Sequence, residues 1–314
     1  MKPHPNMRET YGLTLVELGR KNRNIVALEA DLGKSTRSVL FQEAFPGRYF
    51  QMGIAEQNMA ATAAGLALVG KIPFTHSFAV FAVGRAFDQL RTTICIPGLK
   101  IRICGSSCGF SDFGDGKTHQ SVEDVAIMRS LPNMTVLSPM DSIETVKMME
   151  CLVDWPGPVY IRINRSDLPF LFPPDEPYHI GKITKLRHGS DVALVASGVM
   201  VSRSLEAAGI LAEKGISARV VNLSTIKPLD REGLIEAVTG VRAIVVSEEH
   251  TIVGGLGGAV LEALRAVPHA PVELVGIKDC FGLSAINYNE LLARFELTGP
   301  AIAGAAMDLL RISR

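Results

Sequence analysis

Three segments of the chain contain residue types that carry chemistry, and the first surrounds a carboxylate. In Gln51-Met-Gly-Ile-Ala-Glu-Gln-Asn-Met59, Glu56 opens an alanine-rich run. A carboxylate in the first turn of a helix commonly complements the helix dipole, which is worth roughly 0.3–1 kcal/mol. Because the run after Glu56 is predicted to be buried, its carboxylate also needs a partner to offset desolvation. Glu56 is therefore a candidate for ligand binding as well as for a role within its helix.

The second segment, 74–91, combines aromatic and cationic side chains. Phe78 and Phe81 are three residues apart, so they are predicted to share one face of a helix. Such a pair most often belongs to a hydrophobic core, and His76 is most simply a hydrogen-bonded core histidine. Arg85 follows on the same run.

The third segment, 105–120, contains four glycines, several serines and two aspartates, and it predicts a long loop without regular structure. Long loops inside compact domains are usually functional or disordered. His119 with Asp115 offers a titrating group beside a carboxylate, which suits acid–base chemistry near neutral pH. An isolated histidine in a polar loop is most often inert, so both interpretations stay open at this point.

The elements that hold these segments follow from alternation along the chain. Short β-branched runs alternate with longer amphipathic or alanine-rich runs, which indicates parallel sheets covered by helices on both faces. Ligands bind such sheets at the carboxyl ends of the strands. Strands are predicted at 25–29, 49–52, 72–76, 101–104, 135–137, 159–163, 192–195, 218–221, 243–247 and 272–275. Helices are predicted at 37–44, 56–69, 202–214, 230–238 and 257–266.

A break in composition divides this alternation in two. Four prolines between 169 and 177 indicate a linker that crosses the surface. We therefore expect an α/β protein with two doubly wound domains, 1–168 and 188–314, joined by the linker 169–187. The run Gly254-Gly-Leu-Gly-Gly258 lacks the G-x-G-x-x-G spacing, so it predicts close helix–strand packing and no dinucleotide site.

The composition argues against several classes of protein. Lysine plus arginine equals aspartate plus glutamate at 32 each, so neither nucleic acid nor an anionic membrane is expected as a partner. The apolar stretch 60–69 is too short to span a bilayer, and the N-terminal residues lack a signal-peptide core. Five cysteines favour reduced thiols in the cytoplasm. Cys104 and Cys108 lack a second ligand pair at zinc spacing, so no metal site is expected on this chain.

Taken together and in this order, the three segments resemble the pyrimidine-binding domain of transketolases. The similar motifs are Gly53-Ile-Ala-Glu-Gln-Asn-Met59, the run from Pro73 to Arg91, Gly114-Asp-Gly-Lys-Thr-His-Gln120, Ile161-Arg-Ile-Asn-Arg165, Thr225-Ile-Lys-Pro-Leu-Asp230 and Val246-Ser-Glu-Glu-His250. The resemblance covers almost the whole chain, and the motifs together are far more specific than any one alone. It implies transfer of a two-carbon ketol unit from a ketose, or ketose phosphate, to an aldose, with thiamine diphosphate as cofactor.

The resemblance also implies roles around the cofactor. Glu56 matches the carboxylate that hydrogen-bonds the pyrimidine N1′ and activates the cofactor. Phe78 and Phe81 match the aromatic residues that hold the aminopyrimidine, and Arg85 belongs to the same cofactor-binding motif. His119 matches a histidine that contacts the substrate.

Further roles concern the substrate. Asp115 matches the carboxylate that reads the C2 hydroxyl of the acceptor. Arg8, Ser35 and Arg165 match the far end of the channel, where the family grips a sugar phosphate through bidentate, charge-assisted bonds. At this end, Ser107 stands where the family usually has histidine, so one phosphate contact is missing or replaced.

A second departure from the family is also local. Gly114 stands where the family usually has glutamate before the Asp-Gly pair.

A larger departure concerns the metal. Transketolases begin with a domain that binds the diphosphate through Mg²⁺ and is marked by Gly-Asp-Gly with an asparagine further on. The triplet Gly114-Asp-Gly116 belongs to the substrate loop, and no asparagine lies between Asn133 and Asn164. The resemblance therefore implies the C-terminal subunit of a split transketolase. Its partner chain would supply the Mg²⁺ ligands, with two copies of each chain in an α2β2 complex.

Two other functions remain open from the sequence. The beta subunit of a 2-oxo-acid dehydrogenase has the same two-domain plan, but the loop ending at Gln120 and the segment 225–230 favour transketolase. A non-catalytic regulatory subunit could also keep the fold. Loss of Glu56, Asp115 or His119 would have supported it, and all three are present.

Overall fold

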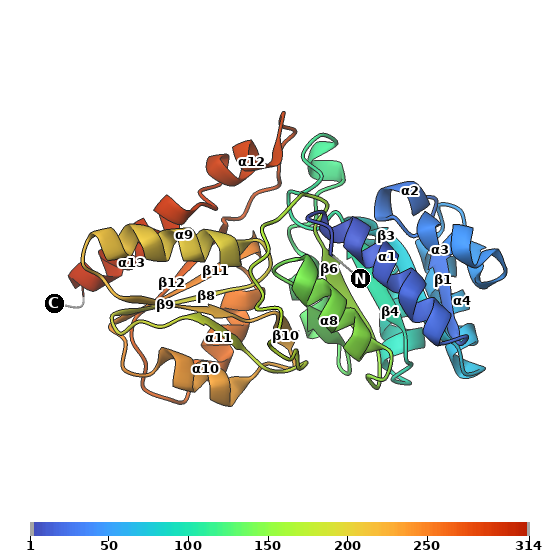
Figure 1. Ribbon diagram of the computed structural model, residues 1–314, viewed down its shortest axis with the longest axis horizontal. Coiled ribbons are helices and arrows are strands. Elements are labelled where there is room, and N and C mark those ends of the chain that lie inside the picture. The colour runs from blue at the N-terminus through green and yellow to red at the C-terminus, as the bar shows by residue number, and fades with distance from the viewer. Residues whose placement is uncertain (1–2, 313–314) are drawn as a thin grey trace.

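A computed structural model describes residues 3–312 and shows two α/β units packed side by side (Figure 1). The first contains a seven-stranded sheet with strand order β10-β5-β6-β4-β3-β1-β2, and the second a five-stranded sheet with order β12-β11-β8-β9-β7. Strand pairs are parallel except for β10 with β5 and β7 with β9. The predicted fold class, two domains with mainly parallel sheets, is confirmed.

The first unit contains most of the segments singled out in the sequence. Its strands are β1 (Ile25–Glu29), β2 (Tyr49–Gln51), β3 (Ile72–Phe78), β4 (Arg102–Ser106), β5 (Thr135–Leu137) and β6 (Val159–Ile163), joined by β10 (Thr225–Lys227) from the second half of the chain. Its helices are α1 (Met7–Lys21), α2 (Gly33–Thr36), α3 (Val39–Ala44), α4 (Glu56–Leu68), α5 (Ala79–Gly84), α6 (Phe87–Gln89), α7 (Asp124–Ser130) and α8 (Ser142–Leu152), with short helices η1 (Pro46–Arg48), η2 (Leu90–Cys95) and η3 (Gly116–Thr118).

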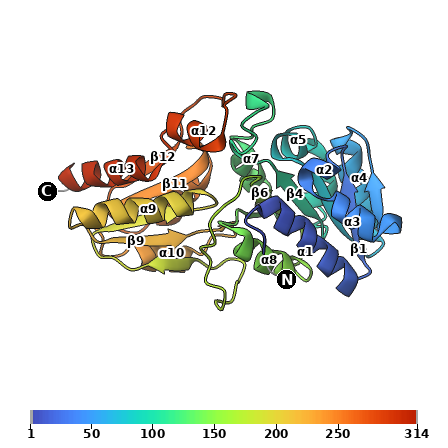
Figure 2. The same ribbon diagram turned by 45° about the horizontal axis from the view of Figure 1, so that its top comes forward.

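The second unit repeats the strand–helix alternation. Its strands are β7 (Thr184–Arg187), β8 (Val192–Ala196), β9 (Ala218–Asn222), β11 (Ala243–Thr251) and β12 (Val272–Ile277). Its helices are α9 (Met200–Glu213), α10 (Arg231–Val238), α11 (Leu256–Leu264), α12 (Tyr288–Arg294) and α13 (Gly299–Ile312). Figure 2 shows α9 and α13 on one face of this sheet and α10 on the other.

All ten predicted strands are present, and the central ones are buried along their whole length. Apolar, β-branched runs of this kind are what a parallel sheet covered on both faces requires. Two strands were not predicted. β7 and β10 are short and antiparallel, and β10 crosses from the second half of the chain to the first sheet.

The linker differs from its prediction in two ways. Residues 184–187, its last four, form β7 and pair with β9, so the second sheet begins inside the predicted linker. The segment is also tied down. Phe172 and Tyr178 are buried, and the carboxylate of Asp141 accepts hydrogen bonds from the amides of Leu171 and Phe172.

The burial predicted for the alanine-rich helix α4 holds for one face only. Met59, Ala60 and Ala63 are buried, whereas Ala61 is exposed and Leu68 is 73% exposed. In the described part of the chain, no helix is long and apolar enough to cross a membrane.

The glycine-rich run near the start of α11 packs as predicted. A Cβ on Gly257 would lie 2.8 Å from a methyl group of Leu274 on β12, so a larger residue would push the helix off the sheet. The amides of Leu256 and Gly257 donate to the buried carboxylate of Glu248, at 2.6 and 2.8 Å. The amides at the start of α11, which could otherwise bind an anionic ligand, are therefore occupied by the Glu248 carboxylate.

Candidate active site

The candidate residues come from loops at one edge of the first sheet. Ser35 lies after β1, Glu56 after β2, the 107–120 loop after β4 and Arg165 after β6. Because neighbouring strands β2, β1, β3, β4 and β6 run parallel, their carboxyl ends open onto the same edge. Helix α1 adds Arg8 from its first turn.

Glu56 sits at the first position of α4, after a turn in which Gly53 has a left-handed φ of 69°. Its carboxylate is 3% exposed and accepts from Ser77 Oγ at 3.3 Å. Arg85 Nη1 donates to both carboxylate oxygens, at 3.1 and 3.3 Å, while the arginine side chain itself is 48% exposed. A buried acid thus has a counterion that stands half in solvent.

Phe78 and Phe81 lie beside this ion pair, although the prediction that they share a helical face is wrong. Phe78 is the last residue of β3, paired with Ser106 of β4, and α5 begins only at Ala79. Because Phe78 still pairs with Ser106 of β4, helix α5 begins one residue later, at Ala79. The rings still stack, with centroids 6.0 Å apart and planes 17° from parallel.

His119 and Arg85 complete this group around the aromatic rings. The Arg85 guanidinium lies 4.1 Å from the centre of the Phe81 ring. The His119 ring contacts Phe81 edge-on at 5.2 Å and Phe78 at 6.1 Å. We name Glu56, Phe78, Phe81, Arg85 and His119 the aromatic cluster, since the structure brings all five predicted residues together.

Asp115 is exposed and lies outside this set of contacts. The Nδ1 atom of His119 is 2.9 Å from Thr118 Oγ1, and no hydrogen bond joins His119 to Asp115 in the described residues. A different carboxylate, that of Asp112, interacts electrostatically with both Asp115 and His119. Burial raises the pKa of Asp112, Asp115 raises it further, and Arg165 and His119 oppose the rise.

The second predicted group also comes together. Arg8 Nη1 donates to the carbonyl oxygen of Ser35 at 2.9 Å. The pKa of Arg8 is lowered by burial and by the charges of Arg165 and Arg37. Arg165 Nη1 forms an ion pair of 2.7 Å with Asp112 Oδ2. We name Arg8, Ser35, Asp112 and Arg165 the arginine cluster.

Asp112 is the member of this cluster that the sequence did not single out. Its side chain is 3% exposed, which a polar residue in a glycine-rich loop does not predict. Only its spacing from Asp115 and His119 in the loop motif could have drawn attention to it. Ser107 is fully buried with a left-handed φ of 53°, and its hydroxyl has no hydrogen-bond partner among the described residues.

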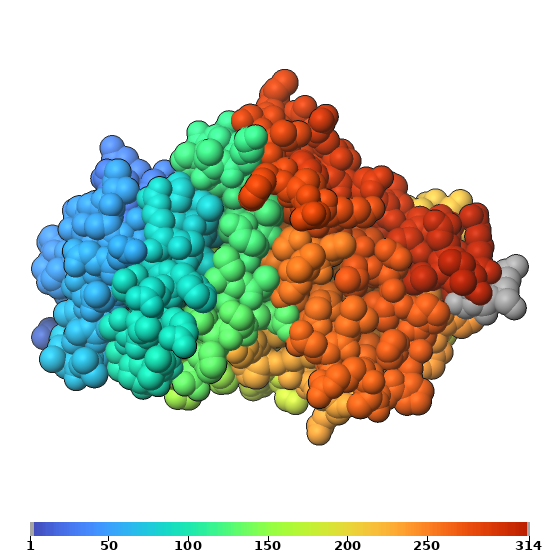
Figure 3. Space-filling view, turned by 180° about the vertical axis from the view of Figure 1, so that it is seen from behind, coloured from blue at the N-terminus to red at the C-terminus, as the bar shows by residue number. Residues whose placement is uncertain are grey.

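The loop 105–120 has little regular structure, as predicted, with only the end of β4 and the short η3 in it, and it is packed against the second unit. Its Phe110 ring lies 4.5 Å from that of Phe295, and the Phe110 amide donates to Glu249 Oε1 at 2.8 Å. Gln120 Nε2 donates to the carbonyl of Leu283 at 2.9 Å. In Figure 3 the green loop region meets the orange-red C-terminal region without a gap. The second domain therefore supports the loop that carries His119.

Glu249 is a further residue whose role local sequence did not reveal. It lies in β11, is fully buried, and burial raises its pKa to about 7 against the opposing charge of Arg162. Beneath it, Arg162 pairs with Asp124 at 2.7 Å, and Tyr160 donates to the same carboxylate at 2.6 Å. This network anchors the base of the loop between the two units.

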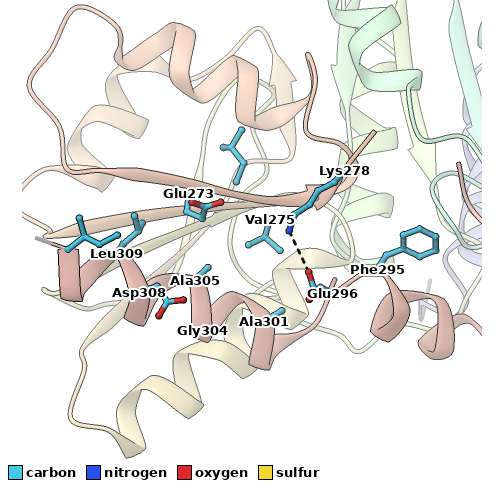
Figure 4. A pocket seen from close by; sticks show the side chains of 13 residues that line it. Glu273, Val275, Lys278, Phe295, Glu296, Ala301, Gly304, Ala305, Asp308 and Leu309 are labelled. Atoms are coloured by element: carbon cyan, nitrogen blue, oxygen red, sulfur yellow. Dashed lines mark ion pairs between the residues drawn. The ribbon is translucent and has the colours of Figure 1, made fainter. Parts of the chain in front are cut away.

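A further groove lies in the second unit, away from these clusters. A groove of about 370 Å³ lies between β12 and α13, where Lys278 and Glu296 form an ion pair of 3.5 Å (Figure 4). It contains none of the candidate residues. Within residues 3–312, no group of three or more His, Cys, Asp or Glu side chains is arranged to hold a metal ion, and all five cysteines are free.

Comparison with known proteins matches both units. Residues 4–170 match the family model "Transketolase, pyrimidine binding domain" and residues 181–302 match "Transketolase, C-terminal domain". A protein from Methanocaldococcus jannaschii described as "Putative transketolase C-terminal section" is 41% identical over 311 residues, covering 98% of this chain and 97% of that protein. A 6-deoxy-6-sulfo-D-fructose transketolase subunit from Clostridium sp. is 40% identical, covering 96% of this chain and 94% of its own length.

Solved structures agree with these matches. A chain described as "Split gene transketolase, inactive beta4 tetramer" superimposes with a TM-score of 0.89 at 45% identity, covering 98% of this chain and 99% of that one. A transketolase from Campylobacter jejuni shares the fold at 22% identity with a TM-score of 0.83, and this chain spans 46% of its length.

Proposed function

This chain belongs to the transketolase family, and on that premise we propose that it is the C-terminal subunit of a split transketolase. Its activity is the transfer of a two-carbon ketol unit from a ketose to an aldose, with thiamine diphosphate as cofactor. The observation that carries this proposal is the buried carboxylate of Glu56 beside the stacked rings of Phe78 and Phe81. The domains proposed are 1–168 and 188–314, and the two family matches support that division.

The aromatic cluster fits an aminopyrimidine. A flat, partly polar ring needs apolar faces to lie against and a hydrogen-bond acceptor at one edge. Phe78 and Phe81 supply the faces, and Glu56 supplies a buried acceptor. Thiamine diphosphate, when bound, supplies a nucleophilic thiazolium carbon that carries the two-carbon unit.

The chain's own residues then have distinct tasks. Glu56 holds a proton shared with the pyrimidine ring nitrogen, and burial strengthens that hydrogen bond. Arg85, half exposed beside Glu56, donates hydrogen bonds to both of its carboxylate oxygens and so fixes their position. His119, on the edge of the aromatic pair, is placed to bind or exchange a proton with a substrate hydroxyl. Asp115 and the arginine cluster bind the rest of the sugar.

A partner chain completes the site in this proposal. The Mg²⁺ ion and its ligands belong to an N-terminal subunit, and two copies of each chain form the complex. Exposed apolar side chains at both ends of α4 support an interface along this helix, since Ile54, just before Glu56, is 73% exposed and Leu68 and Val69, at the far end, are 73% and 74% exposed. The similar chain described as an inactive β4 tetramer supports the view that this type of subunit is incomplete alone.

Reconstitution with the N-terminal subunit tests the proposed function. We expect transfer from a ketose phosphate to an aldose only when both chains, Mg²⁺ and thiamine diphosphate are present. Exclusive oxidation of a 2-oxo acid with a lipoyl acceptor would assign the chain to the dehydrogenase beta subunits instead. Absence of turnover with every donor, from a correctly assembled complex, would favour a regulatory subunit.

A further inference from the structure

The charges of the far end of the channel are largely neutralised within the chain. Three arginines gather there, because the charges of Arg165 and Arg37 both act on Arg8. Arg37 pairs with Glu9 at 2.5 Å, and Arg165 pairs with Asp112 at 2.7 Å. Among the described residues, Arg8 forms no ion pair, and its guanidinium donates a hydrogen bond to the Ser35 carbonyl. Three arginines thus face two carboxylates, Glu9 and Asp112, which also act on Arg8, so these five side chains have a net charge of +1.

Burying the Asp112 carboxylate beside these arginines costs desolvation free energy. Its carboxylate is 3% exposed, so it loses most of its hydration and depends on Arg165 to stay ionised. A buried acid on one of its arginines lowers the net positive charge that the site offers to a doubly charged anion. The position of Asp112, bonded to Arg165 and close to His119 and Asp115, places it within the substrate channel of the proposed function.

We propose that Asp112 sets the selectivity of this channel for the terminal group of the sugar, favouring a terminal monoanion such as a sulfonate over a phosphate dianion. This inference rests on the proposed function and names the substrate class of the same site. Asp112 lowers the positive charge that a terminal group meets from two, on Arg8 and Arg165, to one.

The two kinds of terminal group differ in charge far more than in shape. A phosphate monoester carries about −1.5 to −2 charges at pH 7, since its second pKa is about 6. It would leave negative charge uncompensated and would be repelled by Asp112 at close range. A sulfonate keeps a single charge and can still accept hydrogen bonds from the guanidinium of Arg8.

The test uses the reconstituted two-chain enzyme and one common donor without a terminal anion, hydroxypyruvate. The acceptors are three-carbon aldoses that end in a phosphate, a sulfonate or a hydroxyl group. For the native chain we expect kcat/KM to be highest with the sulfonate. Asp112→Asn keeps the shape but frees Arg165, so the phosphate-to-sulfonate ratio of kcat/KM should rise at least tenfold. Asp175→Asn, at an exposed linker position, is the matched control.

Each result bears on one of the two claims. A native enzyme that prefers the phosphate acceptor tenfold or more, or an Asp112→Asn variant with an unchanged ratio, would overturn the inference and leave the proposed function intact. No transfer to any of the three acceptors would overturn the proposed function, and the inference with it. If the Asp112→Asn variant fails to fold, Arg165→Gln is the alternative test variant. It removes the cation and should weaken both anionic acceptors relative to the hydroxyl acceptor.

Discussion

The aromatic cluster and the arginine cluster lie on the same sheet edge but treat charge in opposite ways. In the aromatic cluster a buried acid, Glu56, is paired with an arginine that is half exposed. In the arginine cluster the acid Asp112 is buried against an arginine, and so cancels a charge that a ligand could use. In the first arrangement the carboxylate can accept a hydrogen bond from a ligand. In the second, the acid lowers the net positive charge of the site and so determines which ligand charge the site favours.

The difference suggests a division of labour. Chemistry at a cofactor needs a fixed acceptor and fixed ring faces, and these come from strand ends and a helix start. Selection of a substrate terminus needs a charge balance that single substitutions can shift, and Asp112 lies in the loop between β4 and η3, outside regular structure. Variants in each cluster should therefore affect different kinetic constants.

The largest effect is expected at Glu56. Glu56→Gln keeps the size of the side chain but removes the acceptor charge, so kcat of the reconstituted enzyme should fall roughly 10²- to 10⁴-fold. Thermal unfolding should change little, because Arg85 can turn to solvent. Glu213→Gln, at an exposed position of α9, is the control. Turnover within a few-fold of the native value would show that another group activates the cofactor.

The next effect concerns the anchor that the two clusters share. The pKa of Glu249 is raised by burial to about 7 in the folded chain, above its unfolded value of 4.5. Its proton is therefore bound more tightly in the folded state, and the free energy of unfolding should fall as pH rises from about 4.5 to about 7. For this group alone the fall is on the order of 3 kcal/mol.

Glu249→Gln should remove that part of the pH dependence, as urea unfolding at pH 5 and pH 8 would measure. Glu144, whose pKa burial also raises to about 7, keeps its own contribution in the variant and provides an internal reference. If the native chain and the variant lose stability equally between the two pH values, Glu249 is not held protonated by its site.

The smallest effect is expected at Phe81. Phe81→Leu keeps an apolar side chain but loses the ring that lies between Arg85 and His119. Ring stacking is worth about 0.5–1.5 kcal/mol, so the affinity of the assembled complex for thiamine diphosphate should fall about tenfold or less. Titration of the apo-complex measures this, with Phe170→Leu, an exposed linker position, as control. An unchanged Kd would remove Phe81 from the cofactor site.

Much of the fold could be predicted because its core strands have a recognisable local sequence pattern. Runs such as Val192–Ala196 are apolar throughout and buried on both faces, so their sequence alone predicts a buried strand. Helix α1 was not predicted, since it buries Thr10 and Thr14, whose polarity hides the apolar face. Thr14 satisfies its hydroxyl within the helix, on the Thr10 carbonyl at 2.7 Å. Strand β10 depends on a partner strand far away in sequence, which no local pattern encodes.

The candidate site shows the same limit. Glu56, Phe78, Phe81, Arg85 and His119 lie within recognisable motifs, and the structure brings them together. Asp112 and Glu249 escaped notice, because their importance comes from burial and from partners more than 50 residues away in sequence. Only the folded chain shows that Asp112, in a loop, neutralises the charge of Arg165, which follows β6.

The central claim is that this chain holds half of a thiamine-diphosphate site and that a partner chain holds the other half. Calorimetric titration of thiamine diphosphate with Mg²⁺, into the isolated chain and into the two-chain complex, tests it most directly. We expect weak binding without Mg²⁺ dependence for the isolated chain, and tight, Mg²⁺-dependent binding for the complex. Tight, Mg²⁺-dependent binding by the isolated chain would contradict the claim.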